Sequence, residues 1–571
     1  MSIAGAKSVV RALEDEGIEL AFGIPGTHNI ELYDALAESA RVRAVLVTDE
    51  QSASFMADGA WRASGRMACV NIVPGAGLTH AMSGIAEAFM DGVPMLVLGC
   101  GIRQDTGRAY QLHDVNQLAI ARPVTKAQLR PERGEEIYAT VREACRLARD
   151  GTPGPVFVEI PANLYLLTHE RDLPYTPPSA ERRAPSPAIL DRIVNLLKGK
   201  RPLLYAGLGA LDSDLVQLAE RLDAPVATTF SGKGVFPETH PLFLWCGFGE
   251  AAPEFARRIA GECEATLVIG ARFGEVATGS YGVKPPGPLV HVDIASEVIG
   301  RNFAAEIAVA ADAREFVAAL VPMLEPRKPD PALRDRIAAG HAGVRKEWEA
   351  HASRDRVTPS RLLGALQARF GHASAFVTDS GNGTFLAMEM LRLDGPRRFL
   401  APVDYSCMGY SVPAALGAKL AAPERPVIAL AGDGAFLMTG LELVTAASEG
   451  IAAIVLVLRD GELAQIAQFQ STAMNRKTKS VLADYGLKAI CEGIGVACLD
   501  LERDADIVEV LSRAAEIVDD GAPVVIDVAI DYSERTYFTR GVVKTSLGRL
   551  PLRDRLRFIG RAVVRRILPR A

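Results

Sequence analysis

Two aspartates follow apolar runs that are typical of buried parallel strands. Asp433 comes after residues 426–431, and Asp460 comes after residues 453–458. The carboxyl ends of parallel strands meet at one edge of a sheet, so both carboxylates are expected at a ligand-binding edge. Oxygen ligands of this kind suit a Mg²⁺ ion that also holds a diphosphate. From the spacing alone, a helix cap and an ordinary turn residue remain equally good interpretations.

The turn after the first of these strands favours close approach of a ligand to the backbone. Gly432 and Gly434 carry no side chain that would block such an approach. Thr439 followed by Glu442 fits a capping box, which predicts a helix over residues 439–448. The N-terminus of that helix would lie near the glycine turn and favour an anion.

Glu50 is the ionisable residue of greatest interest in the N-terminal part of the chain. It follows a predicted strand at residues 42–47 and precedes a predicted helix that contains Phe55 and Met56. Position alone favours a solvent-facing carboxylate at the start of a helix over a catalytic group.

Strands and helices alternate along most of the chain, which predicts parallel sheets joined by right-handed crossovers. The expected fold class is therefore α/β, with three doubly wound parallel-sheet domains. The predicted strands are residues 20–22, 42–47, 69–73, 93–98, 155–161, 202–206, 225–229, 265–270, 289–293, 375–378, 426–431, 453–458 and 521–528. Proline-rich or charged linkers separate the domains at residues 174–187 and 325–359. The predicted domains and C-terminal tail are residues 1–170, 188–325, 358–535 and 536–571.

The composition limits the classes of function. The chain has 571 residues, a net charge of −6 and 49% hydrophobic residues, which suits several domains with large cores. The negative charge argues against general nucleic-acid binding. The 8 cysteines are scattered without a C-x-x-C pair, so free thiols in a reducing compartment are expected. We expect a cytoplasmic protein, because the N-terminus lacks a long apolar segment and no apolar run is long enough to cross a membrane.

Several of these segments resemble motifs of the thiamine-diphosphate (ThDP) enzymes that include acetolactate synthases and 2-oxo acid decarboxylases. The Gly-Asp-Gly turn and Asp460 are similar to the motif that holds the diphosphate and Mg²⁺, although Arg459 and Asp460 replace the family's Asn-Asn pair. The resemblance implies that Asp433, Asp460 and the carbonyl of Glu462 bind the metal. The other matching segments are residues 22–26, 48–50, 57–60, 86–88, 122–126 and 463–470.

The resemblance also implies a role for residues that meet the cofactor rings. Glu50 would hydrogen-bond the aminopyrimidine and so start the proton relay that activates the thiazolium. Met408 would wedge between the two rings, and the backbones of Ser406 and Met408 would hold the pyrimidine. The remaining predicted cofactor contacts are Pro25, Gly26, Gly381, Asn382, Gly432, Gly434, Ala435 and Leu463.

Three further polar residues are predicted to face the substrate, namely His28, Gln111 and His113. His28 and Gln111 resemble a histidine and a glutamine of benzaldehyde lyase, whereas acetolactate synthases share only the glutamine. A neutral histidine beside the reacting carbon would move a proton to or from a hydroxyl group. A turn or capping role remains the alternative for His28, and a structural role remains the alternative for His113.

The resemblance implies a ThDP- and Mg²⁺-dependent carboligase or lyase. Such an enzyme forms an acyl-anion intermediate from a 2-oxo acid or a 2-hydroxy ketone and passes it to an acceptor carbonyl. A simple 2-oxo acid decarboxylase and a 2-hydroxyacyl-CoA lyase are the alternatives within the class, and a non-catalytic ThDP-binding scaffold is the alternative outside it. FAD is not expected, because residues 272–276 read Arg-Phe-Gly-Glu-Val where flavin-binding acetolactate synthases carry Arg-Phe-Asp-Asp-Arg.

The family builds each active site between two chains, so a homodimer or a dimer of dimers is expected. The C-terminal tail is strongly basic, with Asp554 as its one acid, and it carries apolar residues at helical spacing. These apolar residues are Leu552, Leu556, Ile559, Val563 and Ile567. Such a helix either packs on its own protein or lies on anionic lipid, as it does in pyruvate oxidases of this superfamily.

Overall fold

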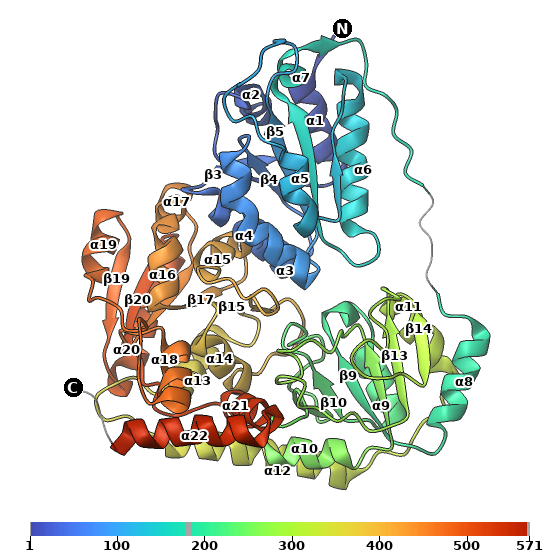
Figure 1. Cartoon of the computed structure of the whole chain (residues 1–571), viewed down its shortest axis with the longest axis vertical. Coiled ribbons are helices and arrows are strands. Elements are labelled where there is room, and N and C mark those ends of the chain that lie inside the picture. Colours follow the sequence, from blue (N-terminus) through green and yellow to red (C-terminus); the bar gives the residue numbers. More distant parts are fainter. Residues whose placement is uncertain (1, 179–183, 568–571) are drawn as a thin grey trace.

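Three six-stranded parallel sheets form three domains, and helices flank each sheet (Figure 1). The computed structural model describes residues 2–178 and 184–567. The N-terminal domain lies at the top of Figure 1, and the central and C-terminal domains lie side by side below it. The expected α/β class with three doubly wound parallel sheets is confirmed.

The N-terminal sheet has the strand order β3-β2-β4-β5-β7-β6. Its strands are β2 (Leu20–Gly23), β3 (Arg43–Leu46), β4 (Cys69–Ile72), β5 (Met95–Gly101), β6 (Ala127–Leu129) and β7 (Pro155–Pro161). Its helices are α1 (Gly5–Asp15), α2 (Ile30–Ala37), α3 (Glu50–Ser64), α4 (Ala76–Asp91), α5 (Gln117–Ala121), α6 (Ile137–Arg149) and α7 (Ala162–Leu166). The antiparallel pair β1 (Ile3–Ala4) and β8 (Thr168–His169) joins the ends of the domain. The order reverses between β2 and β4, and ligands of open α/β sheets bind beyond the strand ends at such a point.

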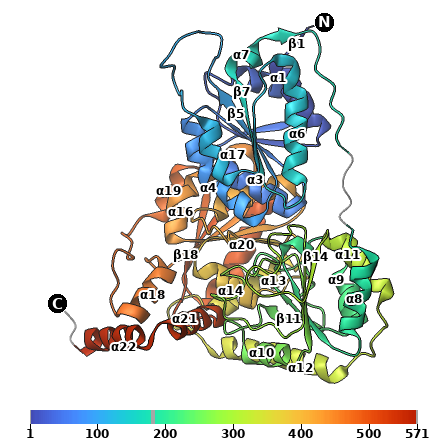
Figure 2. The ribbon, with the colours of Figure 1, turned by 45° about the vertical axis from the view of Figure 1, so that its right-hand side comes forward.

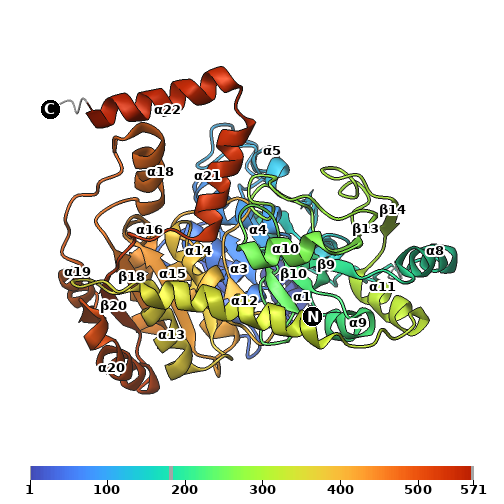
Figure 3. The same cartoon turned by 90° about the horizontal axis from the view of Figure 1, so that it is seen from below.

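The central sheet has the order β11-β10-β9-β12-β13-β14, the strand order of dinucleotide-binding folds. Its strands are β9 (Pro202–Ala206), β10 (Val226–Thr228), β11 (Phe243–Cys246), β12 (Ala265–Ile269), β13 (Leu289–Asp293) and β14 (Ile307–Ala310). Its helices are α8 (Pro187–Leu197), α9 (Leu215–Leu222), α10 (Glu254–Gly261) and α11 (Ala313–Leu320). The long helix α12 (Pro331–Ala350) leads to the C-terminal domain and lies along the lower face of the molecule (Figures 1 and 3).

The C-terminal sheet, with the order β16-β15-β17-β18-β20-β19, repeats the topology of the N-terminal sheet. Its strands are β15 (Ala375–Thr378), β16 (Phe399–Leu400), β17 (Val427–Gly432), β18 (Ile454–Arg459), β19 (Ala497–Leu501) and β20 (Val524–Ala529). Its helices are α13 (Pro359–Phe370), α14 (Asn382–Met390), α15 (Ser411–Ala421), α16 (Asp433–Thr439), α17 (Leu443–Glu449), α18 (Ala464–Met474), α19 (Leu487–Gly493) and α20 (Ile507–Asp519). In both sheets the strand order reverses beside the segments that carry the predicted cofactor residues.

Helices α3 and α15 bring the N-terminal and C-terminal domains into direct contact. A Cβ on Gly59 of α3 would lie 2.1 Å from the carbonyl oxygen of Ala414, and a Cβ on Gly417 of α15 would lie 2.0 Å from that of Met56. The two backbones therefore touch where these glycines cross. Around this crossing, buried side chains of both domains form one continuous hydrophobic cluster.

A helical stretch over residues 440–449 follows Thr439 as predicted, but the predicted capping box is wrong, because no side chain caps this end. Helix α16 begins at Asp433, and a 3₁₀ turn, η5 (Gly440–Glu442), separates it from α17. The residues of the supposed capping box have other partners. The Thr439 hydroxyl donates to the carbonyl of Gly409, and the Glu442 carboxylate accepts hydrogen bonds from Thr48 of the N-terminal domain.

The C-terminal tail contains two helices with different surroundings. In α21 (Tyr537–Arg549) the side chains of Phe538 and Thr539 are buried against the body of the protein. Helix α22 (Leu552–Ile567) extends along the edge of the molecule beside α18 (Figures 2 and 3). The basic residue Arg570 lies outside the described residues. None of the described helices is both long and apolar enough to cross a bilayer.

Candidate active site

Glu50 is the first residue of α3, and its side chain is buried rather than solvent-facing. The Asp49 carboxylate accepts hydrogen bonds from the backbone N–H groups of Gln51 and Ser52, which fixes the start of the helix. Glu50 is 7% exposed, and its Oε2 lies 3.3 Å from Nδ1 of His80 on α4. The position-based expectation of a solvated carboxylate is therefore wrong.

Two glycine turns enclose the carboxyl group of Glu50 and the β2 edge. A Cβ on Gly77 would lie 3.2 Å from Oε1 of Glu50, and a Cβ on Gly26 would lie 2.4 Å from Cγ1 of Val73. A side chain at position 26 would force Val73 to move, and one at position 77 would press on Glu50 and Val73 by a few tenths of an ångström. The predicted contact Pro25 precedes Gly26 and is exposed at the mouth of the turn.

The structure brings two of the three predicted substrate-facing residues together. The rings of His28 and His113 lie 5.4 Å apart, and burial together with the neighbouring His113 lowers the pKa of His28. Nδ1 of His113 is buried without a hydrogen-bond partner among the described residues. Gln111 instead turns back onto its own loop, where its amide donates to the carbonyls of Arg103 and Arg108. This half of the site therefore offers two neighbouring imidazole rings, His28 and His113, close to the β2 edge.

The strand ends of β17 and β18 bring Asp433 and Asp460 together. Oδ2 of Asp433 accepts hydrogen bonds of 2.9 Å from the N–H groups of Asp460 and Gly461. Its Oδ1 accepts a hydrogen bond of 3.1 Å from the hydroxyl of Tyr485. Asp433 is only 2% exposed, so it is a structural part of this strand junction as well as a candidate ligand.

The donor set around Asp460 fits a divalent cation. Burial, with Asp433 and Glu462 nearby, raises the pKa of Asp460 to about 6, and a bound cation would offset this cost of burying the carboxylate. Arg459 pairs with the other carboxylate instead, because its Nε lies 3.6 Å from Oδ1 of Asp433. Among the described residues no group of three or more His, Cys, Asp or Glu side chains gathers at one point. The metal would therefore be held by two carboxylates and by carbonyl oxygens such as that of Glu462.

Glycine and two apolar side chains shape the space next to these carboxylates. A Cβ on Gly434 would lie 2.5 Å from Cδ2 of Leu463 and 3.1 Å from Cε of Met408, so both side chains close over the glycine. Gly432 has open space around its Cα, and Ala435 is buried beneath the turn. This concave surface leaves main-chain groups accessible to a bound diphosphate.

Asp379, at the end of β15, holds the segment that contains Met408. Its Oδ1 accepts a hydrogen bond of 2.9 Å from the N–H of Gly409, and its Oδ2 accepts one of 2.7 Å from Ser411. Ser406 adopts the left-handed region with φ of 64°, and its hydroxyl lies 2.9 Å from that of Ser380. These contacts fix the backbone that is predicted to hold a pyrimidine.

Comparison with known proteins identifies the family to which these three domains belong. Residues 3–120, 190–320 and 379–528 match the N-terminal TPP-binding, central and C-terminal TPP-binding domains of thiamine pyrophosphate enzymes. The chain belongs to the thiamine pyrophosphate enzyme family. It is 30% identical to acetolactate synthase isozyme 3 large subunit of Escherichia coli, over 94% of this chain and 96% of that protein. It is 32% identical to the acetolactate synthase large subunit of Corynebacterium glutamicum, over 92% of this chain and 86% of that protein.

This thiamine pyrophosphate enzyme is therefore of the acetolactate synthase-like type that the sequence motifs indicated. A relative from Methanocaldococcus jannaschii, described as a probable acetolactate synthase large subunit, is 29% identical over 93% of the chain and 92% of its own length. The similarity spans all three domains, so it covers both halves of the site.

A cavity of about 240 Å³ opens beside the candidate cofactor residues of this enzyme. Gly381 and Ser406 line one side, and aromatic side chains form much of the rest. The aromatic residues come from the central domain, the C-terminal domain and α21, and they are Phe230, Phe385, Phe469 and Phe538. Near its wall, Nδ2 of Asn382 is buried without a partner among the described residues, which leaves a hydrogen-bond donor for a ligand.

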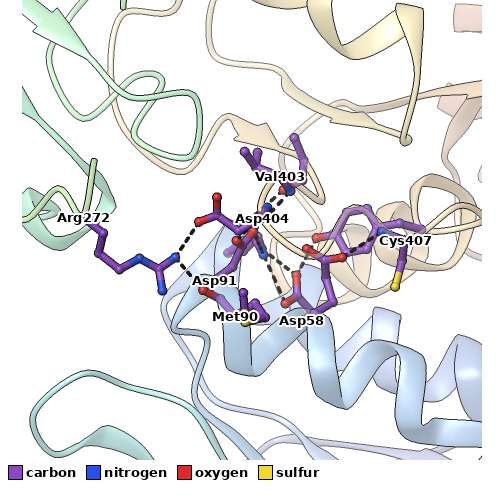
Figure 4. A network of polar contacts seen from close by, with 11 residues as sticks. Asp58, Met90, Asp91, Arg272, Val403, Asp404 and Cys407 are labelled. Atoms are coloured by element: carbon purple, nitrogen blue, oxygen red, sulfur yellow. Dashed lines mark hydrogen bonds and ion pairs between the residues drawn. The ribbon is translucent and has the colours of Figure 1, made fainter. Parts of the chain in front are cut away.

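A buried polar network ties the Met408 segment of this enzyme to the N-terminal domain (Figure 4). The Glu87 carboxylate accepts a hydrogen bond of 3.0 Å from the N–H of Cys407, and the Asp91 carboxylate accepts from the N–H of Asp404 at 3.3 Å. Arg62 pairs with Asp91 at 2.8 Å from within α3. Burial, with Asp91 nearby, raises the pKa of Glu87 inside this network.

The central domain joins the same network through Arg272. Its guanidinium donates to the Asp404 carboxylate and to the carbonyl of Met90, so one side chain contacts both other domains (Figure 4). Residues from three domains thus hold the 401–408 segment in place. The sequence motifs identified this segment but not what supports it.

Three residues with a place in the site were not indicated by sequence reasoning. These are Asp379, His80 and Tyr485. Asp379 follows a predicted strand, so its position at the sheet edge was a usable signal. His80 and Tyr485 lie on a helix and in a loop without any pattern, and only the folded chain places them beside Glu50 and Asp433.

Proposed function

We propose that this enzyme uses ThDP and Mg²⁺ to ligate or cleave carbon–carbon bonds next to a carbonyl group. The donor would be a 2-oxo acid or a 2-hydroxy ketone, and the acceptor would be a second carbonyl compound. The observation that carries the proposal is the burial of Glu50 beyond the strand ends of one sheet, together with two aspartates brought together at the ends of β17 and β18 in a second sheet of the same topology. ThDP supplies, when bound, the nucleophilic carbon that attacks the donor carbonyl.

The chain's own groups hold the cofactor and move protons. Glu50, shielded from water, would share a proton with a ring nitrogen of the pyrimidine. Asp433, Asp460 and the Glu462 carbonyl would bind the metal and through it the diphosphate. His28, whose pKa burial lowers, stays neutral near pH 7 and would exchange a proton with a substrate hydroxyl group.

We propose that the active form is a homodimer or a dimer of dimers. Exposed apolar side chains directly follow the Gly-Asp-Gly turn, and they form a surface that a second copy would cover. These residues are Leu437, Met438, Leu441 and Val444, between 42% and 60% exposed. Sedimentation at assay concentration tests the assembly, and a fully active monomer would contradict it.

The remaining parts of the proposal concern location and flavin. We propose a cytoplasmic enzyme that binds no FAD. In the central domain the Arg272 guanidinium is already committed to Asp404 and Met90, so it is not free to bind a flavin phosphate. A purified protein with flavin absorbance would contradict this part of the proposal.

Replacement of Glu50 tests the proposed chemistry. Glu50→Gln should lower turnover by about 10²- to 10⁴-fold, the usual contribution of a general acid–base group, while ThDP still binds. CO₂ release and product formation from a panel of 2-oxo acids, with and without aldehyde acceptors, provide the assay. Glu254→Gln is the matched control, because this glutamate is on the surface with a 74% exposed side chain. Near-normal turnover of Glu50→Gln would refute the role of Glu50.

A further inference from the structure

Helix α22 packs on the protein with its polar side and turns its apolar side to solvent. Leu552, Leu556, Ile559 and Val563 are spaced to share one face of the helix, and they are 68%, 61%, 49% and 47% exposed. An amphipathic surface helix of a globular protein normally has the opposite orientation, with its apolar stripe towards the core. The apolar face of α22, defined by these four residues, is therefore left without a partner inside the chain.

The contacts of the other side explain how the helix is held in this orientation. Nη1 of Arg565 donates to the carbonyl of Met474 at the end of α18, with a length of 3.1 Å. Within α22 itself, the guanidinium of Arg561 lies 4.6 Å from the ring centre of Phe558, and both side chains are partly buried on this side of the helix. Nη2 of Arg555 donates to the carbonyl of Gly548 in α21. Specific polar contacts thus hold the apolar face outward.

Positive charge borders the apolar face on both sides. Six arginines and one aspartate lie on α22. At 100° per residue, Arg553 and Arg557 flank the apolar face on one side, and Arg555 and Arg566 flank it on the other. Within the described chain, the one ion pair of these arginines joins Arg557 to Asp554. Most of this positive charge is therefore available to an external anion.

A basic loop extends the same surface beyond α22. Residues 475–479, which follow Met474 directly, read Asn-Arg-Lys-Thr-Lys and are exposed. Lys477 pairs with Glu462, whereas Arg476 and Lys479 form no ion pair with any described residue. The loop adds positive charge beside the end of α18 that α22 contacts.

We propose that α22 docks this enzyme on an anionic lipid surface, with its apolar face in the interfacial region and its arginines at the headgroups. Interfacial helices combine an apolar face with basic residues in this way. A second copy is a poorer occupant, because two such faces in contact would also bring their arginine borders together. The apolar surface formed by Leu437, Met438, Leu441 and Val444 provides a contrast, since the elements that carry it, α16, η5 and α17, contain no Lys or Arg.

Co-sedimentation of the full-length enzyme with vesicles tests the proposal. The enzyme should bind vesicles of mixed phosphatidylglycerol and phosphatidylcholine, bind phosphatidylcholine alone much more weakly, and dissociate as salt rises. Ile559→Gln combined with Val563→Gln should lower the partition coefficient by about tenfold or more. Arg553→Gln combined with Arg566→Gln should lower it by roughly fivefold per arginine.

Matched controls separate docking from general effects. Val508→Gln removes a 74% exposed apolar side chain on α20 and should leave vesicle binding unchanged. All of these positions are on the surface, so far-ultraviolet circular dichroism should show unchanged folding. Failure of the wild type to bind the mixed vesicles would overturn the proposal, and so would equal binding by the Ile559/Val563 variant. Dissociation of the oligomer in that variant would also overturn it, because the face would then belong to a second copy.

Discussion

Replacing Gly417 by alanine should loosen the contact between the two cofactor-binding domains. A Cβ at this position would lie 2.0 Å from the carbonyl oxygen of Met56, and this oxygen belongs to the backbone of α3. Helix α3 has no side chain to rotate away at that point, so the two helices must separate by about 1 Å or more to restore normal contact distances.

The expected magnitude follows from two opposing effects. Overpacking of a close contact costs about 1–3 kcal/mol, and a rigid backbone neighbour favours the upper end of that range. Alanine in place of glycine within a helix returns about 1 kcal/mol. We therefore expect Gly417→Ala to lose about 2 kcal/mol of stability. Gly364→Ala on α13 is the matched control, because nothing lies within 4 Å of its Cβ and only the helical gain of about 1 kcal/mol applies there.

Thermal unfolding followed by circular dichroism, at a fixed ThDP concentration, measures the difference. The Tm should fall for Gly417→Ala and rise slightly for Gly364→Ala. ThDP affinity should fall with stability in the first variant, because α3 begins at Glu50 and α15 follows the Met408 segment. A Gly417→Ala enzyme with unchanged Tm and unchanged affinity would refute the idea that this crossing positions the site.

Three further predictions test the surroundings of the site. Burial raises the pKa of Glu389 to about 8 from its ordinary 4.5, so the native state keeps a proton that the unfolded chain releases. Stability should therefore fall by up to about 5 kcal/mol as pH rises through this window, and Glu389→Gln should flatten the dependence of Tm on pH. Phe469→Ala should enlarge the cavity and raise the ratio of kcat/KM for bulky acceptor aldehydes to that for small ones by about tenfold. An unchanged ratio would show that the acceptor does not bind in this cavity. Asp433→Asn should weaken Mg²⁺ activation by about 10- to 100-fold in a metal titration, with the 96% exposed Asp484 replaced by Asn as the control.

Sequence patterns indicated the interior strands of every sheet, and they missed strands at the edges. In the three six-stranded sheets the missed strands are β6, β11, β14, β16 and β19, and each is an edge strand. The edge strand β3 was indicated, and the short antiparallel pair of β1 and β8 was also missed. An interior strand is buried on both faces and gives a continuous apolar run, whereas β14 alternates between buried and exposed residues and β16 has only two residues. The topology was predictable because the strands that determine it are the buried ones.

The candidate site was predictable where a residue stands at a strand end, and less so elsewhere. Asp433 and Asp460 are drawn together by hydrogen bonds between adjacent strands, which the spacing of two apolar runs already implied. Gln111 could not be placed in the same way, because a loop determines its position. The amphipathic tail was identified from its periodicity, but periodicity does not say which face of a helix meets the protein.

Polar residues that join two domains look like surface residues in a sequence. Thr439 and Glu442 matched a capping box, yet Glu442 is buried and accepts hydrogen bonds from Thr48 of another domain. Glu87 likewise belongs to an ordinary helix but holds the N–H of Cys407, next to Met408. Such a carboxylate is stable only where the facing domain supplies donors, since burial without partners would be costly. The N-terminal and C-terminal domains of one chain therefore behave as a single preassembled unit. In the proposed dimer, two such units would meet without first rearranging. The strand ends that carry Glu50 and those that carry Asp433 would already be in place in each unit.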